Sequence, residues 1–226
     1  MVVNGRDAGR LSQTVSEIKE RYGSRVLAVC ADVTTTKGRE ALLAACPDPD
    51  ILVNNNAGPT PGAFASFDHA AWLDALEGNL VAAVLMTGAV IEGMQARQFG
   101  RIVNVTSAMV TTPRPHMALS SAARAGLTAA VKALSLDVAA DNVTINNLLP
   151  ERFDTDRQRF MAERVMEREG IDYDEARRRQ EQSIAAKRLG RPEEFGAACA
   201  FLCSAQAGYI SGNNLHLDGG SYPGLV

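Results

Sequence analysis

The chain has 226 residues, 46% of them hydrophobic, and its 23 Lys and Arg against 26 Asp and Glu give a formal net charge of −3. This length and composition exclude collagen and extended disorder, and they predict one domain that buries about 70% of the surface of the unfolded chain. The mild acidic balance argues against a nucleic-acid partner, and the lack of an apolar run of about 18 residues argues against a membrane span. Four scattered cysteines fit a reducing compartment. We therefore expect a cytoplasmic protein without a metal site.

Short runs rich in β-branched residues alternate with longer stretches of helical periodicity. The predicted strands cover residues 2–3, 25–31, 50–54, 101–107, 143–148 and 213–217. The predicted helices cover residues 11–22, 37–45, 68–97, 118–140 and 192–204. Strands that alternate with helices, without hairpin signals, predict an α/β fold with a doubly wound parallel sheet in a single domain.

One segment, residues 151–191, interrupts this alternation. It carries ten Arg and one Lys against ten Asp and Glu, with few apolar residues. We expect it to form a charged helical flap within the domain. Because the charges balance, a solvated helix pair is favoured over a phosphate-binding patch.

Five motifs occur in a fixed order along the chain. They are Asn55-Asn56-Ala57-Gly58, Asn79-Leu80, residues 100–107, residues 146–155 and Asp218-Gly219-Gly220. In this order and at these spacings they resemble the short-chain dehydrogenase/reductase family, particularly its 3-oxoacyl-acyl-carrier-protein-reductase-like members, over essentially the whole chain. The resemblance implies a Rossmann-like fold with a nicotinamide cofactor across the carboxyl ends of the strands.

The resemblance also implies which residues contact the cofactor. They are Arg6, Asp32, Val33, Asn55, Ala57, Gly58, Pro150 and Thr155. A basic residue at the end of the first predicted strand favours NADP(H) over NAD(H), because it can pair with the 2′-phosphate. The alternatives are a surface arginine at position 6, an ordinary helix start near Asp32 and a plain turn at residues 55–58.

The first departure from the family concerns the phosphate site. The family's first strand, glycine-rich turn and first helix have no counterpart before Val2. Backbone N–H groups of that turn normally hold the pyrophosphate at a helix N-terminus. We therefore expect NADP(H) binding to be weak or absent, and the sheet to be open where that strand would lie. Either the chain is truncated or another segment fills the gap.

The second departure concerns the proton donor. The family's Tyr-x-x-x-Lys falls on Ser120 and Arg124. An alkyl hydroxyl is a far weaker acid than a phenol with a pKa of about 10, and an arginine supplies charge but does not exchange a proton. The resemblance keeps Ser107 for the substrate carbonyl and Asn79 for a water in the proton relay, with a strand-end cap and a helix kink as alternatives. His116 is a further candidate acid.

Three readings of function stay open. The first is an oxidoreductase that reduces a carbonyl or oxidises an alcohol with NADP(H), impaired in this chain. The second is a catalytically inactive subunit or binding module of the same lineage, and the third is a lyase or other non-redox enzyme. We expect a small-molecule carbonyl or alcohol substrate, no nucleic-acid or membrane partner, and a homo-oligomer formed through residues 68–97 and 118–140.

Overall fold

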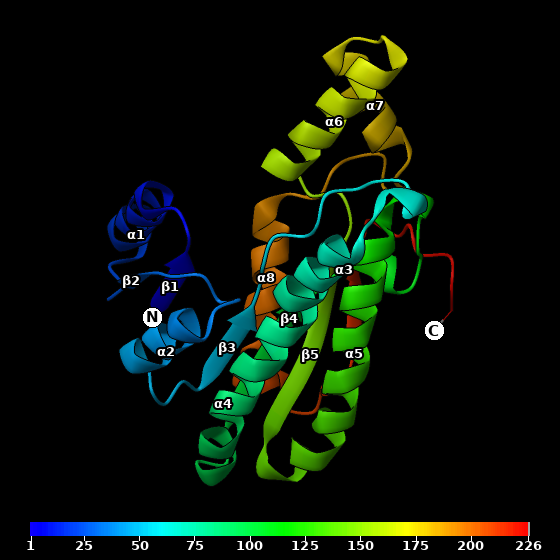
Figure 1. Cartoon of the computed structure of the whole chain (residues 1–226). Helices are drawn as coiled ribbons and strands as arrows, with labels where there is room; N and C mark the ends of the chain where they lie inside the picture. Colours follow the sequence, from blue (N-terminus) through cyan, green and yellow to red (C-terminus); the bar gives the residue numbers. More distant parts are fainter. Residues whose placement is uncertain (226) are drawn as a thin grey trace.

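The computed structural model describes residues 1–225, in which parallel strands are flanked by helices (Figure 1). The strands are β1 (Val2–Gly5), β2 (Leu27–Cys30), β3 (Ile51–Asn54), β4 (Gly100–Val105), β5 (Val143–Pro150) and β6 (Asn214–Leu217). The helices are α1 (Ala8–Tyr22), α2 (Thr36–Ala45), α3 (His69–Leu76), α4 (Ala82–Ala96), α5 (Ala118–Val138), α6 (Asp156–Glu169), α7 (Tyr173–Gln182) and α8 (Pro192–Leu202). Every strand pair is parallel, which confirms the predicted α/β class.

The strands form two sheets rather than one. Strands β3, β4, β5 and β6 make a four-stranded sheet in that order, and β1 pairs only with β2. Figure 1 shows β1 and β2 with α1 and α2 as a unit beside β3. Among residues 1–225 no strand joins β1 to β3, and Leu27, Ile51 and Val53 are 48%, 47% and 44% exposed. The structure therefore has the expected opening in the sheet.

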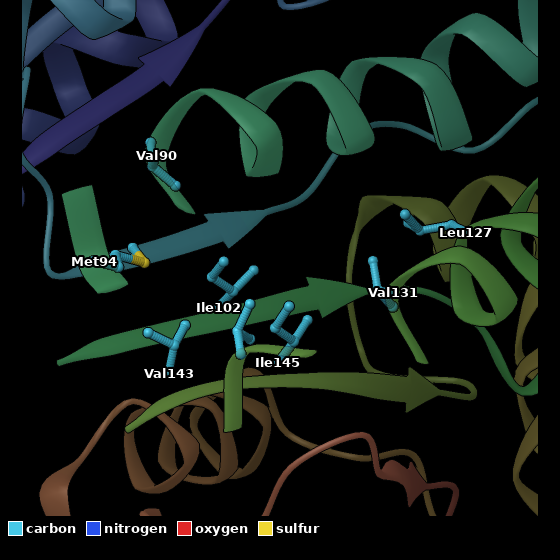
Figure 2. Close-up of a cluster of buried hydrophobic side chains, with 8 residues drawn as sticks. Val90, Met94, Ile102, Leu127, Val131, Val143 and Ile145 are labelled. Carbon is cyan, nitrogen blue, oxygen red and sulfur yellow. The ribbon is translucent and has the colours of Figure 1, made fainter. Parts of the chain in front are cut away.

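The main hydrophobic core lies between the four-stranded sheet and the helices α4 and α5 (Figure 2). Its buried residues are Val90, Met94, Ile102, Leu127, Val131, Val138, Val143 and Ile145. A second cluster, which includes Val103 and Leu148, packs with Leu202 of α8. Because successive side chains of a strand point to opposite faces, Ile102 and Val103 serve different clusters, and both faces of the sheet are covered.

A ladder of four asparagines crosses the four-stranded sheet, with each member in register with the next. Asn54 Nδ2 donates to Asn104 Oδ1 at 2.9 Å, Asn104 Nδ2 donates to Asn147 Oδ1 at 3.1 Å, and Asn147 Nδ2 donates to Asn214 Oδ1 at 2.9 Å. Asn104 and Asn147 are 0% and 2% exposed. The ladder satisfies buried amides, and the pairing fixes the register of all four strands.

The predicted helix over residues 68–97 is continuous but irregular. A π-helical turn, Glu77–Val81, separates α3 from α4. The stretch His69–Ala96 is long and apolar enough to cross a membrane by length and composition alone, with a mean hydropathy of 1.4 in its best window. The core helix of a globular protein passes the same test, and here Met86, Val90 and Met94 are buried.

Replacing Asn104 by alanine should strongly destabilise the protein, because it removes two ladder bonds, leaves Asn147 Oδ1 without a donor and leaves Asn54 Nδ2 with only its longer bond to Thr87 Oγ1. We expect the free energy of unfolding to fall by about 2 to 5 kcal/mol, measured by urea denaturation. Asn213→Ala, at an exposed position beside the ladder, should change it by less than about 0.5 kcal/mol. Equal effects of the two substitutions would contradict a stabilising ladder.

Candidate active site

The carboxyl ends of β3 and β4 bring the predicted site residues into one region. The segment Asn55-Asn56-Ala57-Gly58 leaves β3, and Ser107 follows β4 by two residues. These strands are neighbours in the sheet, so the two segments lie side by side. This edge is where doubly wound sheets bind ligands.

Arg124 of α5 braces the two strand ends. Its Nη1 donates to the carbonyl oxygens of Val105 at 2.6 Å and Thr106 at 3.0 Å, and its Nη2 donates to the carbonyl oxygen of Asn56 at 3.3 Å. Burial, and then the nearby charge of Arg157, lower the pKa of Arg124 to about 10. Arg124 therefore stays charged at neutral pH, and its donors are directed to backbone rather than to a proton relay.

Asn79 is held in the middle of the π-helical turn. Its Nδ2 donates to the carbonyl oxygen of Ala57 at 3.3 Å, while Asn56 Nδ2 donates to the carbonyl oxygen of Gly78 at 3.0 Å. Asn79 is 6% exposed, and its Oδ1 has no hydrogen-bond partner within residues 1–225. Isolated π-helical turns are frequent at functional sites. Here the turn leaves one buried acceptor available to a water or a ligand.

The two serines of the predicted site have different surroundings. Ser107 Oγ accepts from the backbone N–H of Met109 at 3.2 Å, so its own O–H can still donate to another group. Ser120 is 4% exposed and faces a small crevice. The crevice is also lined by Pro59, Thr60, Pro61, His116, Met117 and Leu119. Within residues 1–225, no hydrogen bond joins Ser107 to Ser120 or Arg124.

The residues predicted for the adenosine end lie on the smaller sheet. Arg6 Nη1 is 3.7 Å from Asp32 Oδ2, and their side chains are 67% and 36% exposed. Hydrogen bonds from the backbone and side chain of Thr34, together with the charge of Arg6, lower the pKa of Asp32. An accessible guanidinium therefore stands at the end of β1 beside an ionised carboxylate.

Arg39 joins the two parts of the site, a role that sequence reasoning missed. Its Nη1 donates to the carbonyl oxygens of Val33 and Thr34, both at 2.9 Å, and lies 3.8 Å from Glu77 Oε1. It therefore links the end of β2 to the turn that holds Asn79. One arginine in a predicted helix carries no signal of such a tertiary contact.

The first turn of α1 does not provide a phosphate site. Asp7 caps this helix, and its Oδ1 accepts from the backbone N–H of Arg10 at 2.8 Å. Because a carboxylate already satisfies and neutralises this helix N-terminus, a pyrophosphate group is not favoured there.

The flap contacts the loop after β3 and is not only a solvated helix pair. Pro150 ends β5, and Thr155 precedes α6 and donates from Oγ1 to the carbonyl oxygen of Phe153 at 3.3 Å. Beyond it, Arg157 of α6 donates to the carbonyl oxygen of Pro59. Within residues 1–225, no hydrogen bond joins Pro150 or Thr155 to the other predicted site residues.

Comparison with known proteins places the chain among reductases. The family described as "Enoyl-(Acyl carrier protein) reductase" matches residues 1–222. The 3-oxoacyl-(acyl-carrier-protein) reductase FabG of Vibrio cholerae serotype O1 is 34% identical over 195 residues, covering 84% of this chain and 75% of that protein. The NADPH-dependent reductase BacG of Bacillus subtilis is 28% identical over 226 residues, covering 98% and 87%.

Solved structures give the same grouping. YwfH, an NADPH-dependent reductase involved in bacilysin biosynthesis, has a TM-score of 0.92 at 28% identity, covering 99% of this chain and 89% of that one. L-sorbose reductase from Gluconobacter frateurii, complexed with NADPH and L-sorbose, has a TM-score of 0.92 at 28% identity, covering 99% and 87%.

Arg124→Met should destabilise the fold, because three backbone carbonyls lose their donor. We expect the free energy of unfolding to fall by about 2 to 4 kcal/mol in chemical denaturation. Arg168→Met removes an exposed arginine of α6 and should cost less than about 0.5 kcal/mol. The loss in free energy of unfolding for Arg124→Lys should lie between those two values, since an ammonium lacks the planar fork that reaches both strand ends. A loss no larger for Arg124→Met than for Arg168→Met would show that Arg124 is no brace.

Proposed function

The chain belongs to the short-chain dehydrogenase/reductase family of NAD(P)-dependent oxidoreductases, and we propose that it reduces a small carbonyl compound, or oxidises the corresponding alcohol, with NADP(H). The observation that carries the proposal is the grouping of Ser107, Asn79 and the loop of residues 55–58 at the carboxyl ends of β3 and β4. The names of the relatives, which include NADPH-dependent reductases, support this choice of cofactor.

The residues present fit the adenosine end of NADP(H). Arg6 offers an exposed guanidinium for a 2′-phosphate, beside the carboxylate of Asp32. The residues that would hold the cofactor are Arg6, Asp32, Val33, Asn55, Ala57, Gly58, Pro150 and Thr155. When bound, NADP(H) supplies or accepts the hydride.

The chain's own residues would polarise the carbonyl and manage the proton. Ser107 donates its O–H to the carbonyl oxygen, and the charge of Arg124 stabilises the alkoxide that develops there. Asn79 Oδ1 accepts from a water, which supplies the proton because neither the Ser120 hydroxyl nor the Arg124 guanidinium is a suitable acid near neutral pH. Ser120 and His116 line the small crevice next to Pro59 and Pro61.

One observation favours the alternative of a catalytically inactive subunit or binding module. Arg124 is committed to three backbone carbonyls, and no phenol stands at position 120. The carboxylate cap of α1 supports weak binding of NADP(H) by these residues. A lyase reaction in the same cleft would use Ser107 and Arg124 without a hydride acceptor, and no feature of the site favours it.

The proposal extends to a cytoplasmic homo-oligomer that binds neither nucleic acid nor membranes. Apolar side chains on neighbouring helices remain accessible: Leu73 of α3, Leu85 of α4 and Leu136 of α5 are 51%, 46% and 71% exposed. Ala122 and Ala129 of α5 are exposed and small enough for close approach of a helix from a second copy. A symmetric pairing would bury the same patch on both copies.

Calorimetric titration with NADPH and NADH tests the proposed cofactor. We expect weak binding that favours NADPH, and Arg6→Glu should reduce NADPH affinity by about 10- to 100-fold, the scale of a lost charge-assisted hydrogen bond. Arg21→Glu changes an exposed arginine of α1 and should leave the affinity unchanged. Loss of absorbance at 340 nm with a panel of ketones and aldehydes then reports the reaction. Binding of neither cofactor at millimolar concentration would favour the inactive alternative.

A further inference from the structure

Three arginines contact one short loop, residues 56–61, which runs from the active site to the crevice. Arg124 donates to the carbonyl oxygen of Asn56 at 3.3 Å, Arg157 to that of Pro59 at 3.2 Å, and Arg164 to that of Pro61 at 3.5 Å. The guanidinium groups therefore follow one another along the loop.

These three arginines differ from the other arginines of the flap. In residues 1–225, no carboxylate lies within ion-pair distance of Arg124, Arg157 or Arg164, whereas the neighbouring flap arginines are paired. The paired groups are Arg159 with Asp156, Arg168 with Glu169, Arg177 with Asp154, Arg178 with Glu175, and Arg179 with Glu169 and Glu175. The balanced charge of the flap sequence thus hides an uneven distribution, in which most arginines of the flap are paired with a carboxylate and Arg157 and Arg164 are not.

The unpaired charges are close enough to repel one another. Two causes lower the pKa of Arg124: burial, which is the larger, and the nearby charge of Arg157. The pKa of Arg157 is lowered in the same way, by burial first and then by the charge of Arg164. Arg157 and Arg164 are seven residues apart on α6, which places them on the same helix face. The ring of Phe160 lies between them, with its centroid 6.0 Å and 5.9 Å from their guanidinium carbons. Both arginines are exposed, so a ligand can reach them, and an anion would relieve their repulsion.

The position of this pair relates it to the proposed reaction. Pro59 and Pro61, which accept the hydrogen bonds of Arg157 and Arg164, line the crevice that also contains Ser120 and His116. The loop of residues 56–61 thus contacts Arg124 at one end and the two flap arginines at the other, so a compound lying along this loop would have one end near the catalytic groups and the other near the two guanidinium groups.

We propose that Arg157 and Arg164 form an anion site that binds a carboxylate or phosphate group of the substrate. The substrate class is therefore a carbonyl compound, or its alcohol, that carries an anionic group, such as an oxo acid or a phosphorylated ketone. The carbonyl end of this assignment rests on the proposed oxidoreductase function. The same anion chemistry could also come from the phosphates of NADP(H), so the test must separate the two sources.

The test compares ligand binding to the full chain and to Arg157→Gln/Arg164→Gln, by thermal shift and calorimetry. The probes are inorganic phosphate, acetoacetate, the uncharged methyl acetoacetate, and NADPH. We expect the double variant to bind phosphate and acetoacetate at least 10-fold more weakly, with methyl acetoacetate and NADPH unchanged. The matched control is Arg159→Gln/Arg168→Gln, which alters two paired arginines of the same helix and should bind every probe as the parent does.

A second variant separates loss of charge from loss of fold. Arg157→Lys/Arg164→Lys keeps both charges and should retain phosphate affinity within about threefold. A loss confined to NADPH would assign the arginines to the cofactor and overturn the substrate site, and equal anion binding by the glutamine variant and the parent would overturn any anion site. Arginine-dependent binding of phosphate and acetoacetate, without NADPH binding by the parent, would keep the anion site and reject the proposed oxidoreductase function.

Discussion

The asparagine ladder fixes the position of the candidate active site in the sheet. Because Asn54, Asn104, Asn147 and Asn214 pair in register, the carboxyl ends of β3 and β4 have a fixed offset. The loop of residues 55–58 begins directly after one ladder member, and Ser107 stands three residues after another. A slip of one residue would expose the amides and turn the following side chains to the other face of the sheet. The register of a buried sheet is therefore a condition for the site.

Arg124 joins two segments of the backbone at the position where the family's motif has a lysine. The family's lysine in this motif is a point charge on a flexible stem, whereas a guanidinium offers five donors in a rigid plane. Here that plane joins the end of β4 to the loop after β3, and burial lowers its pKa only to about 10. In the proposed reaction this charge stabilises the reacting oxygen, but the guanidinium does not move a proton. The proposal therefore takes the proton from a water held by Asn79.

Local patterns were sufficient for the elements but not for the contacts between them. The alternation of strands and helices and the irregularity at Asn79 are properties of short segments, and the structure has both. The ladder depends on register, and the bridge from Arg39 to Glu77 depends on how the β1–β2 unit packs. The unpaired face of α6 emerges only when each arginine is matched with its carboxylate in space. Charge counts along the sequence cannot make that distinction.

The pH dependence of carbonyl reduction tests the central claim most directly, namely that a charged Arg124 and a bound water replace the family's phenol and lysine. The measurement is kcat/KM for NADPH-dependent reduction between pH 6 and 11. Since the pKa of Arg124 is lowered to about 10, its charge is present below that pH and is lost above it. We expect a constant kcat/KM from pH 7 to 9 and a decline above about 10. A fall approaching tenfold per pH unit between pH 7 and 9 would show that a group titrating near neutrality supplies the proton, and would contradict the claim.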